Sequence, residues 1–102
     1  MFLNRVEFQG NLTKNPEAFG SDVTICRFDI AVAKMSKDKE KKESDFFTIT
    51  AFGKMADYVM ENFTKGNKAI VLGKVHQNNY KNKEGKMVYG FQFVADSVVK
   101  LA

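Results

Sequence analysis

The chain has 102 residues, of which 44% are hydrophobic and 27% are charged, with 16 basic against 12 acidic residues. This length suits one domain and leaves no room for a second core, while the net charge of +4 favours an anionic partner. No segment approaches the roughly 20 apolar residues of a membrane helix and no signal peptide is visible, so we expect a cytoplasmic protein without a membrane partner. A single cysteine and a single histidine provide neither an internal disulfide nor a metal centre, and we expect no cofactor.

Three segments in the first half of the chain alternate apolar and polar residues, which is the period of a strand with one buried face. They span residues 6–12, 26–33 and 46–52, and a break at Pro16 follows the first. The clearest alternation places four apolar side chains on one face, namely Cys26, Phe28, Ile30 and Val32. These segments predict three strands, and we expect Cys26 to pack on the apolar face of the second.

One helix and two further strands complete the predicted order. Residues 54–63 place apolar side chains four positions apart on one helical face, and the pair Lys65-Gly66 is typical of a helix end. Residues 69–75 and 87–94 are the last two predicted strands. The pattern indicates a mainly all-β fold, a five-stranded Greek-key barrel of the OB-fold type with one helix between strands three and four. We expect this single domain to occupy residues 1–102.

The third predicted strand carries aromatic residues on the face that alternation leaves to solvent. Phe46 and Phe52 lie on that face, opposite a core face that contains Ile49. One interpretation is that the two rings cover a loop or fill a subunit contact. The other is that they stack on nucleobases, where truncation of each ring costs about 1–3 kcal/mol. Because every base has a π-face, the second interpretation predicts binding to unpaired bases of any sequence.

The excess positive charge is concentrated in two polar hairpins. Residues 34–42 contain five lysines against one aspartate and one glutamate, and residues 74–86 contain four lysines against one glutamate. A charged hairpin alone is typical of a solvated surface. The second hairpin also contains Tyr80, which either folds back on the barrel or stacks on a base while neighbouring lysines meet phosphate.

Cations on or near the predicted strands are candidate phosphate contacts, because neutralising phosphate releases counterions and supplies affinity. We rank Arg5, Lys54 and Lys74 above the lysines at hairpin tips, since residues next to strands are better ordered. The remaining candidates are Lys34, Lys81, Lys83 and Lys86, with Asn11 and Thr48 as polar contacts.

The strand predicted at residues 69–75 is apolar on both faces, since Ile70 and Leu72 lie opposite its core face. A strand of this kind needs a second cover. The terminal residues 98–101 or another copy of the chain could provide it, and we favour self-association through Ile70 and Leu72. Gly73, in the middle of this strand, predicts a close backbone approach or a bend of the barrel.

A series of short motifs runs in a fixed order from Asn4 to about Val99. They are Asn4-Arg5-Val6, Gly10-Asn11-Leu12, Asn15-Pro16-Glu17, Phe52-Gly53-Lys54-Met55-Ala56, Phe63-Thr64-Lys65-Gly66 and Val71-Leu72-Gly73-Lys74-Val75. Together they resemble bacterial and phage single-stranded DNA-binding proteins. The resemblance implies an OB-fold that assembles as a homotetramer, with a dimer as the smaller alternative. It also implies a protein that wraps single-stranded DNA during replication, recombination or repair.

The resemblance further implies which rings stack on DNA. The principal stacking aromatics of that family fall on Phe46, Phe52 and Tyr80 here, although the first and last are usually tryptophan. Where the family often has another aromatic residue, this chain has Met35-Ser36. Many members continue into a glycine-rich linker and an acidic tip that recruits other proteins. Because this chain stops at Leu101-Ala102, we expect no recruitment through an acidic tail.

Other functions fit the residues less well. An enzyme would need grouped carboxylates or a nucleophile with a base, but Asp29, Asp45 and Asp57 lie in separate segments and His76 has no evident partner. We therefore expect no catalytic residue. An adaptor of the primosome type would keep the barrel and bind its partners independently of the exposed rings. An RNA chaperone of the cold-shock type is disfavoured by the long loop after the second strand and by the helix.

Overall fold

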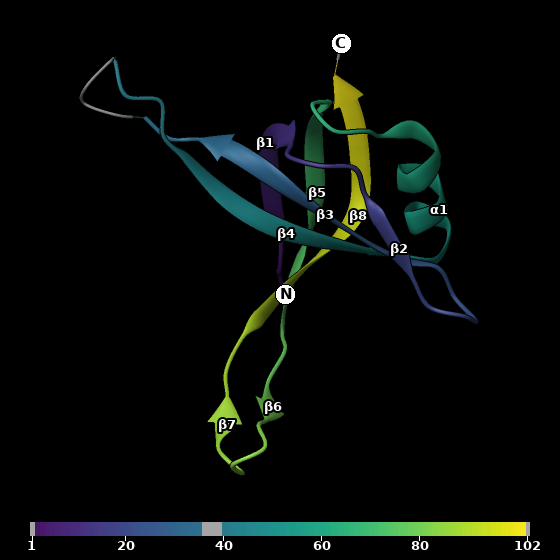
Figure 1. Ribbon diagram of the computed structural model, residues 1–102, viewed down its shortest axis with the longest axis vertical. Coiled ribbons are helices and arrows are strands. Elements are labelled where there is room, and N and C mark those ends of the chain that lie inside the picture. The colour runs from purple at the N-terminus through teal and green to yellow at the C-terminus, as the bar shows by residue number, and fades with distance from the viewer. Residues whose placement is uncertain (1, 36–39, 102) are drawn as a thin grey trace.

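The computed structural model describes residues 2–35 and 40–101 and consists of a β-barrel with one helix (Figure 1). Its strands are β1 (Val6–Leu12), β2 (Glu17–Phe19), β3 (Ile25–Ala33), β4 (Ser44–Phe52), β5 (Lys68–Gln77), β6 (Tyr80–Lys81), β7 (Met87–Val88) and β8 (Phe91–Leu101). Helix α1 (Gly53–Asn62) lies between β4 and β5. The predicted helix and the strands that became β1, β3, β4 and β5 are confirmed, with bounds shifted by a few residues.

Five strands close into the barrel. The sheet order is β1-β5-β8-β4-β3-β2, and an additional pairing of β1 with β3 closes the barrel and leaves β2 outside the closed ring. β1 makes both contacts by changing neighbours along its length, since Val6 lies opposite Gly73 of β5 whereas Leu12 lies opposite Ile30 of β3. Neighbouring strands are antiparallel except β4 and β8, which are parallel. This arrangement confirms the predicted five-stranded OB-fold barrel with its helix between the third and fourth barrel strands.

The last strand differs from the prediction. β7 pairs only with β6, and together they form a hairpin that projects below the barrel in Figure 1. The predicted strand at 87–94 is therefore interrupted at residues 89–90, and β8 continues to Leu101. One alternative was that residues 98–101 cover the outer face of β5. Instead, they pair along the edge of β5, with Val99 opposite Ile70.

The core is formed by inward-facing side chains of the barrel strands together with one face of α1. Its largest buried members are Phe28, Phe63, Ile30, Ile49, Val59 and Val71. α1 packs against β3, β4 and β8, as its predicted apolar face requires. A second group of rings joins this core, in which Phe8 stacks on Phe47 at a centroid distance of 4.4 Å and Phe93 meets both edge-on. In the described part of the chain, no helix has the length and apolar character needed to cross a bilayer.

Cys26 packs inside the barrel as predicted. Its side chain is fully buried, and this burial raises the pKa of the thiol, an effect that a backbone hydrogen bond with Ala51 only partly offsets. A thiol in such surroundings stays protonated near neutral pH and is a poor nucleophile. Cys26 is therefore a structural residue.

Gly73 marks the close approach that its position in the strand predicted. A Cβ atom at Gly73 would lie 2.0 Å from the carbonyl oxygen of Val94 on the neighbouring strand β8. Gly10 shows the same constraint where β1 meets β3, with a Cβ position 2.1 Å from the carbonyl oxygen of Ala31. The barrel closes tightly at these two points because neither residue has a side chain.

Candidate nucleic-acid interface

The outer face of β4 carries Phe46 and Phe52 near its two ends. The side chains are 68% and 43% exposed, so the chain itself covers neither ring completely. The register against β3 places Phe46 beside Ala31 and Phe52 beside Ile25. Six positions along a strand correspond to about 20 Å. The two rings are therefore too far apart to contact one another, and Thr50 between them is buried.

Tyr80 lies on the β6–β7 hairpin, away from the barrel (Figure 1). Its ring is 57% exposed. The side-chain oxygen of Asn82 accepts hydrogen bonds from the backbone N–H groups of Glu84 and Lys86, which orders the turn at the hairpin tip. The hairpin thus presents an aromatic ring together with exposed lysines on a defined turn.

Three of the predicted phosphate-contacting cations are paired with carboxylates. The pairs are Arg5 with Glu7, Lys34 with Asp45 at 3.1 Å, and Lys74 with Asp96 at 3.6 Å. Pairs as exposed as these contribute little to stability, but a phosphate must compete with the carboxylate for the cation. Within residues 2–35 and 40–101, the other four candidates form no ion pair and are exposed, namely Lys54, Lys81, Lys83 and Lys86. The lysines of residues 37 and 39, counted in the first hairpin, lie outside the described residues.

A β-bulge in β8 positions Asp96, the ion-pair partner of Lys74. Leu72 of β5 lies opposite Ser97 of β8, whereas the next residue, Gly73, lies opposite Ala95, so Asp96 is an extra residue in β8. Bulges of this kind redirect a side chain and are frequent beside functional sites. Here the bulge brings the carboxylate of Asp96 to the amino group of the lysine.

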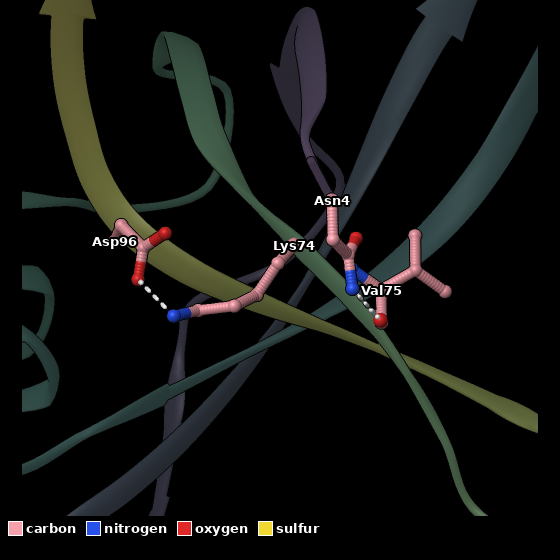
Figure 2. Close-up of polar contacts among 4 residues, drawn as sticks. All are labelled: Asn4, Lys74, Val75 and Asp96. Carbon is pink, nitrogen blue, oxygen red and sulfur yellow. Dashed lines mark hydrogen bonds and ion pairs between the residues drawn. The ribbon is translucent and has the colours of Figure 1, made fainter. Parts of the chain in front are cut away.

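Figure 2 shows that β5 is held on both sides in this region. On one side Lys74 reaches Asp96, and on the other the side-chain amide of Asn4 donates to the carbonyl oxygen of Val75 at 2.6 Å. The oxygen of the same side chain accepts from the N–H of Val75 at 3.0 Å. Asn4 thereby reproduces the pairing of a strand residue and extends the contact between the start of the chain and β5.

The two predicted polar contacts are both engaged within the chain. The hydroxyl of Thr48 donates to the carboxylate of Asp29 at 2.7 Å, and the amide of Asn11 donates to the carbonyl oxygen of Gly66 at 3.1 Å. Both side chains are exposed. Asn11 joins β1 to the turn that follows α1, so its hydrogen bond has a structural role.

Three adjoining hollows cross the outer face of the barrel. We name them after one aromatic residue each: the Phe52 hollow of about 510 Å³, the Phe91 hollow of about 350 Å³ and the Phe19 hollow of about 290 Å³. Gln92 lines the first two, and Arg27 lines the last two. The hollows therefore adjoin one another, and their lining residues lead from β8 across β4 to β3 and β2.

Phe19, Arg27 and Phe91 are surface residues that the sequence reasoning did not select. Phe19 and Phe91 are 44% and 70% exposed, and the guanidinium carbon of Arg27 lies 5.4 Å from the centroid of the Phe19 ring. Phe91 and Phe93 are two positions apart, so alternation assigns both to the buried face of the strand. The pattern therefore gave no sign that the ring of Phe91 is exposed. Phe19 follows the break at Pro16, where no periodic pattern applies.

The predicted interface residues lie on the outer face of β5. Ile70 and Leu72 are half-buried, and the neighbouring Val99 of β8 is 46% exposed. Within the described residues, these three apolar side chains therefore remain partly exposed to solvent.

Comparison with known proteins identifies the family. Residues 3–101 match the model of the single-strand binding protein family. The chain is 38% identical over 99 residues to single-stranded DNA-binding protein 1 of Staphylococcus aureus, and 39% identical over 101 residues to the single-stranded DNA-binding protein of Fusobacterium nucleatum subsp. nucleatum. These alignments cover 94% of this chain but only 64% and 65% of the two relatives. The chain therefore belongs to the single-strand binding protein family.

Proposed function

We propose that this chain binds single-stranded DNA without sequence preference and without catalysis, in replication, recombination or repair. The observation that carries this proposal is the family match over residues 3–101, together with relatives that are named for single-stranded DNA binding. We further propose that it acts in the bacterial cytoplasm or nucleoid. Exposed rings and unpaired lysines on the same surfaces support the proposal.

The binding mechanism that we propose combines stacking with charge neutralisation. Phe46, Phe52 and Tyr80 would each receive an unpaired base, while lysine and arginine side chains neutralise phosphates. In duplex DNA the faces of the bases are already stacked on one another. A surface of this kind therefore prefers single strands without reading base edges.

A fluorescence titration with poly-dT tests this function. The chain has three tyrosines and no tryptophan, so quenching of tyrosine emission reports DNA near Tyr58, Tyr80 or Tyr89. We expect quenching, and an affinity that falls with salt at a slope of about −0.7 per phosphate neutralised. Absence of binding at low salt contradicts the proposal. Tighter binding of an RNA oligomer of equal length favours an RNA chaperone, and binding that is insensitive to Phe46 and Tyr80 favours an adaptor.

The pairing of Lys74 with Asp96 predicts that Asp96→Asn strengthens DNA binding. Removing the carboxylate frees the lysine for phosphate, so the salt slope should steepen by about 0.7. Asp57→Asn is the matched control, because Asp57 lies on α1, forms no ion pair within the described chain and carries the same charge. Equal slopes for the two variants would show that Lys74 does not contact phosphate.

We propose that the apolar strip of Ile70 and Leu72 is covered by another copy of the chain, in a tetramer or a dimer. Leu72→Asp should shift the assembly toward smaller species, as measured by light scattering after gel filtration. Met60→Asp, which places the same charge on an exposed methionine of α1, should leave the mass unchanged. A wild-type protein that is monomeric, or an unchanged mass for Leu72→Asp, would contradict this interface.

A further inference from the structure

The three hollows repeat one combination of side chains. The Phe52 hollow contains Lys74, the Phe91 hollow contains Arg27, and the Phe19 hollow contains Lys14 in addition to Arg27. Each hollow thus offers one exposed aromatic ring and at least one cation. Carboxylates also line the Phe52 hollow (Asp96) and the Phe19 hollow (Glu17 and Asp29), whereas the described lining of the Phe91 hollow contains none. A nucleic-acid strand repeats a base and a phosphate in the same manner, so a row of such hollows fits successive nucleotides of one strand.

Arg27 differs from the cations on either side of it. Lys74 is paired with Asp96, and Lys14 lies 3.6 Å from Asp29. Arg27 forms no ion pair within the described residues, and its guanidinium lies over the ring of Phe19 instead. A cation–π contact orients the guanidinium without neutralising it, so its N–H donors remain available for a phosphate.

The Phe91 hollow has the size and the polar groups for one nucleotide. Its volume of about 350 Å³ lies in the range of small-ligand sites. Besides Phe91 and Arg27, it is lined by four polar residues, namely Thr48, Thr50, Asn78 and Gln92. The N–H of Asn78 donates to the carbonyl oxygen of Gly90, which fixes the base of the β6–β7 hairpin beside the hollow. A base that stacks on the exposed ring would therefore lie among polar residues and not against an apolar wall.

We propose that Phe91 and Arg27 form a nucleotide subsite in the Phe91 hollow, beside Thr48 and Thr50 of β4, with Phe91 stacking on the base and Arg27 binding its phosphate. Phe19 is the positioning residue that holds the guanidinium. Single-stranded DNA then crosses β8, β4 and β3 through the three hollows. This subsite rests on the proposed function, and it adds contacts that Phe46, Phe52 and Tyr80 do not supply.

The test compares Phe91→Ala with Tyr89→Ala in binding a labelled oligo-dT of about 16 nucleotides, the upper length for one OB-fold. Tyr89 is 75% exposed and lies two residues before Phe91, but it lines none of the three hollows. We expect Phe91→Ala to weaken binding about 5- to 150-fold and Tyr89→Ala to leave it within about twofold. Thermal unfolding of each variant verifies that the barrel is intact.

A second probe separates the base contact from the phosphate contact. An abasic strand of the same length keeps its phosphates but has nothing to stack, so Phe91→Ala should bind it as the wild type does. Arg27→Gln should weaken binding of both strands and reduce the salt slope by about 0.7. If the wild type binds oligo-dT but Phe91→Ala and Tyr89→Ala behave alike, the subsite is overturned and the proposed function stands. If the wild type binds neither strand, both are overturned.

Discussion

Gly73→Ala should lower the free energy of unfolding by about 3 kcal/mol, the upper end of the cost of overpacking a core. The added Cβ would lie 2.0 Å from the carbonyl oxygen of Val94, 2.9 Å from its carbon and 3.2 Å from the Cα of Ala95. All three are backbone atoms of β8, so no side-chain rotation relieves the clash. The strands β5 and β8 must separate at the bulge, where Asp96 also loses its place beside Lys74.

Denaturant unfolding followed by circular dichroism measures this loss. For a domain of this size, 3 kcal/mol corresponds to a fall in Tm of about 12–24 °C. Gly90→Ala is the control, since a Cβ there would lie 3.3 Å from the carbonyl oxygen of Asn78, a contact that a small shift accommodates. Neither glycine has a positive φ, so the comparison isolates steric contact from backbone conformation. Equal stability of Gly73→Ala and the wild type would show that the two strands are less tightly packed here.

Phe52→Ala should weaken binding of oligo-dT by about 1–2 kcal/mol, the cost of removing one stacking ring. Phe52 is 43% exposed, lines the Phe52 hollow and lies next to the first turn of α1. Its side chain makes no capping hydrogen bond to the helix, so truncation leaves the helix start unchanged. The effect should therefore appear in binding and not in stability.

Tyr58→Ala is the matched control for this experiment. Tyr58 has the same exposed fraction of 43%, but it lies on α1 and its ring contacts Phe63 edge-on at 6.0 Å. Fluorescence anisotropy with the labelled oligonucleotide should show wild-type affinity for Tyr58→Ala. A Phe52→Ala variant with wild-type affinity would remove Phe52 from the stacking surface, and equal losses in both variants would point to a general effect of surface aromatics.

The sequence was sufficient for those elements whose pattern is local. Alternation identified β3 and β4 because apolar and polar residues alternate along both, with Cys26, Phe28 and Ile30 buried in β3 and Ile49 and Ala51 in β4. The helical spacing identified α1. β2 was missed because all three of its residues are exposed, and it forms only where β3 offers a free edge opposite Arg27. β8 was predicted to end at Val94 because the bulge at Asp96 breaks its alternation, although pairing with β5 continues to Leu101.

The candidate site was less predictable because its electrostatics depend on the register between strands. Phe46, Phe52 and Tyr80 could be selected as aromatic residues at polar positions, and all three are exposed. Nothing in the local sequence indicates that Lys74 meets a carboxylate 22 positions further along, since that contact requires a bulge in β8. Arg5, Lys54 and Lys74 were ranked above the hairpin lysines because residues next to strands are better ordered. That argument does not account for the carboxylate partners of Arg5 and Lys74.

The position of β8 has a consequence for how the protein is made. β8 lies between β5 and β4 in the sheet, although it is the last of the described strands along the chain. While the ribosome has delivered only the residues before 91, β4 and β5 each present an unpaired edge, and the barrel cannot close. We therefore expect a nascent chain that stays open until the final strand leaves the exit tunnel, and that needs protection from aggregation during this interval.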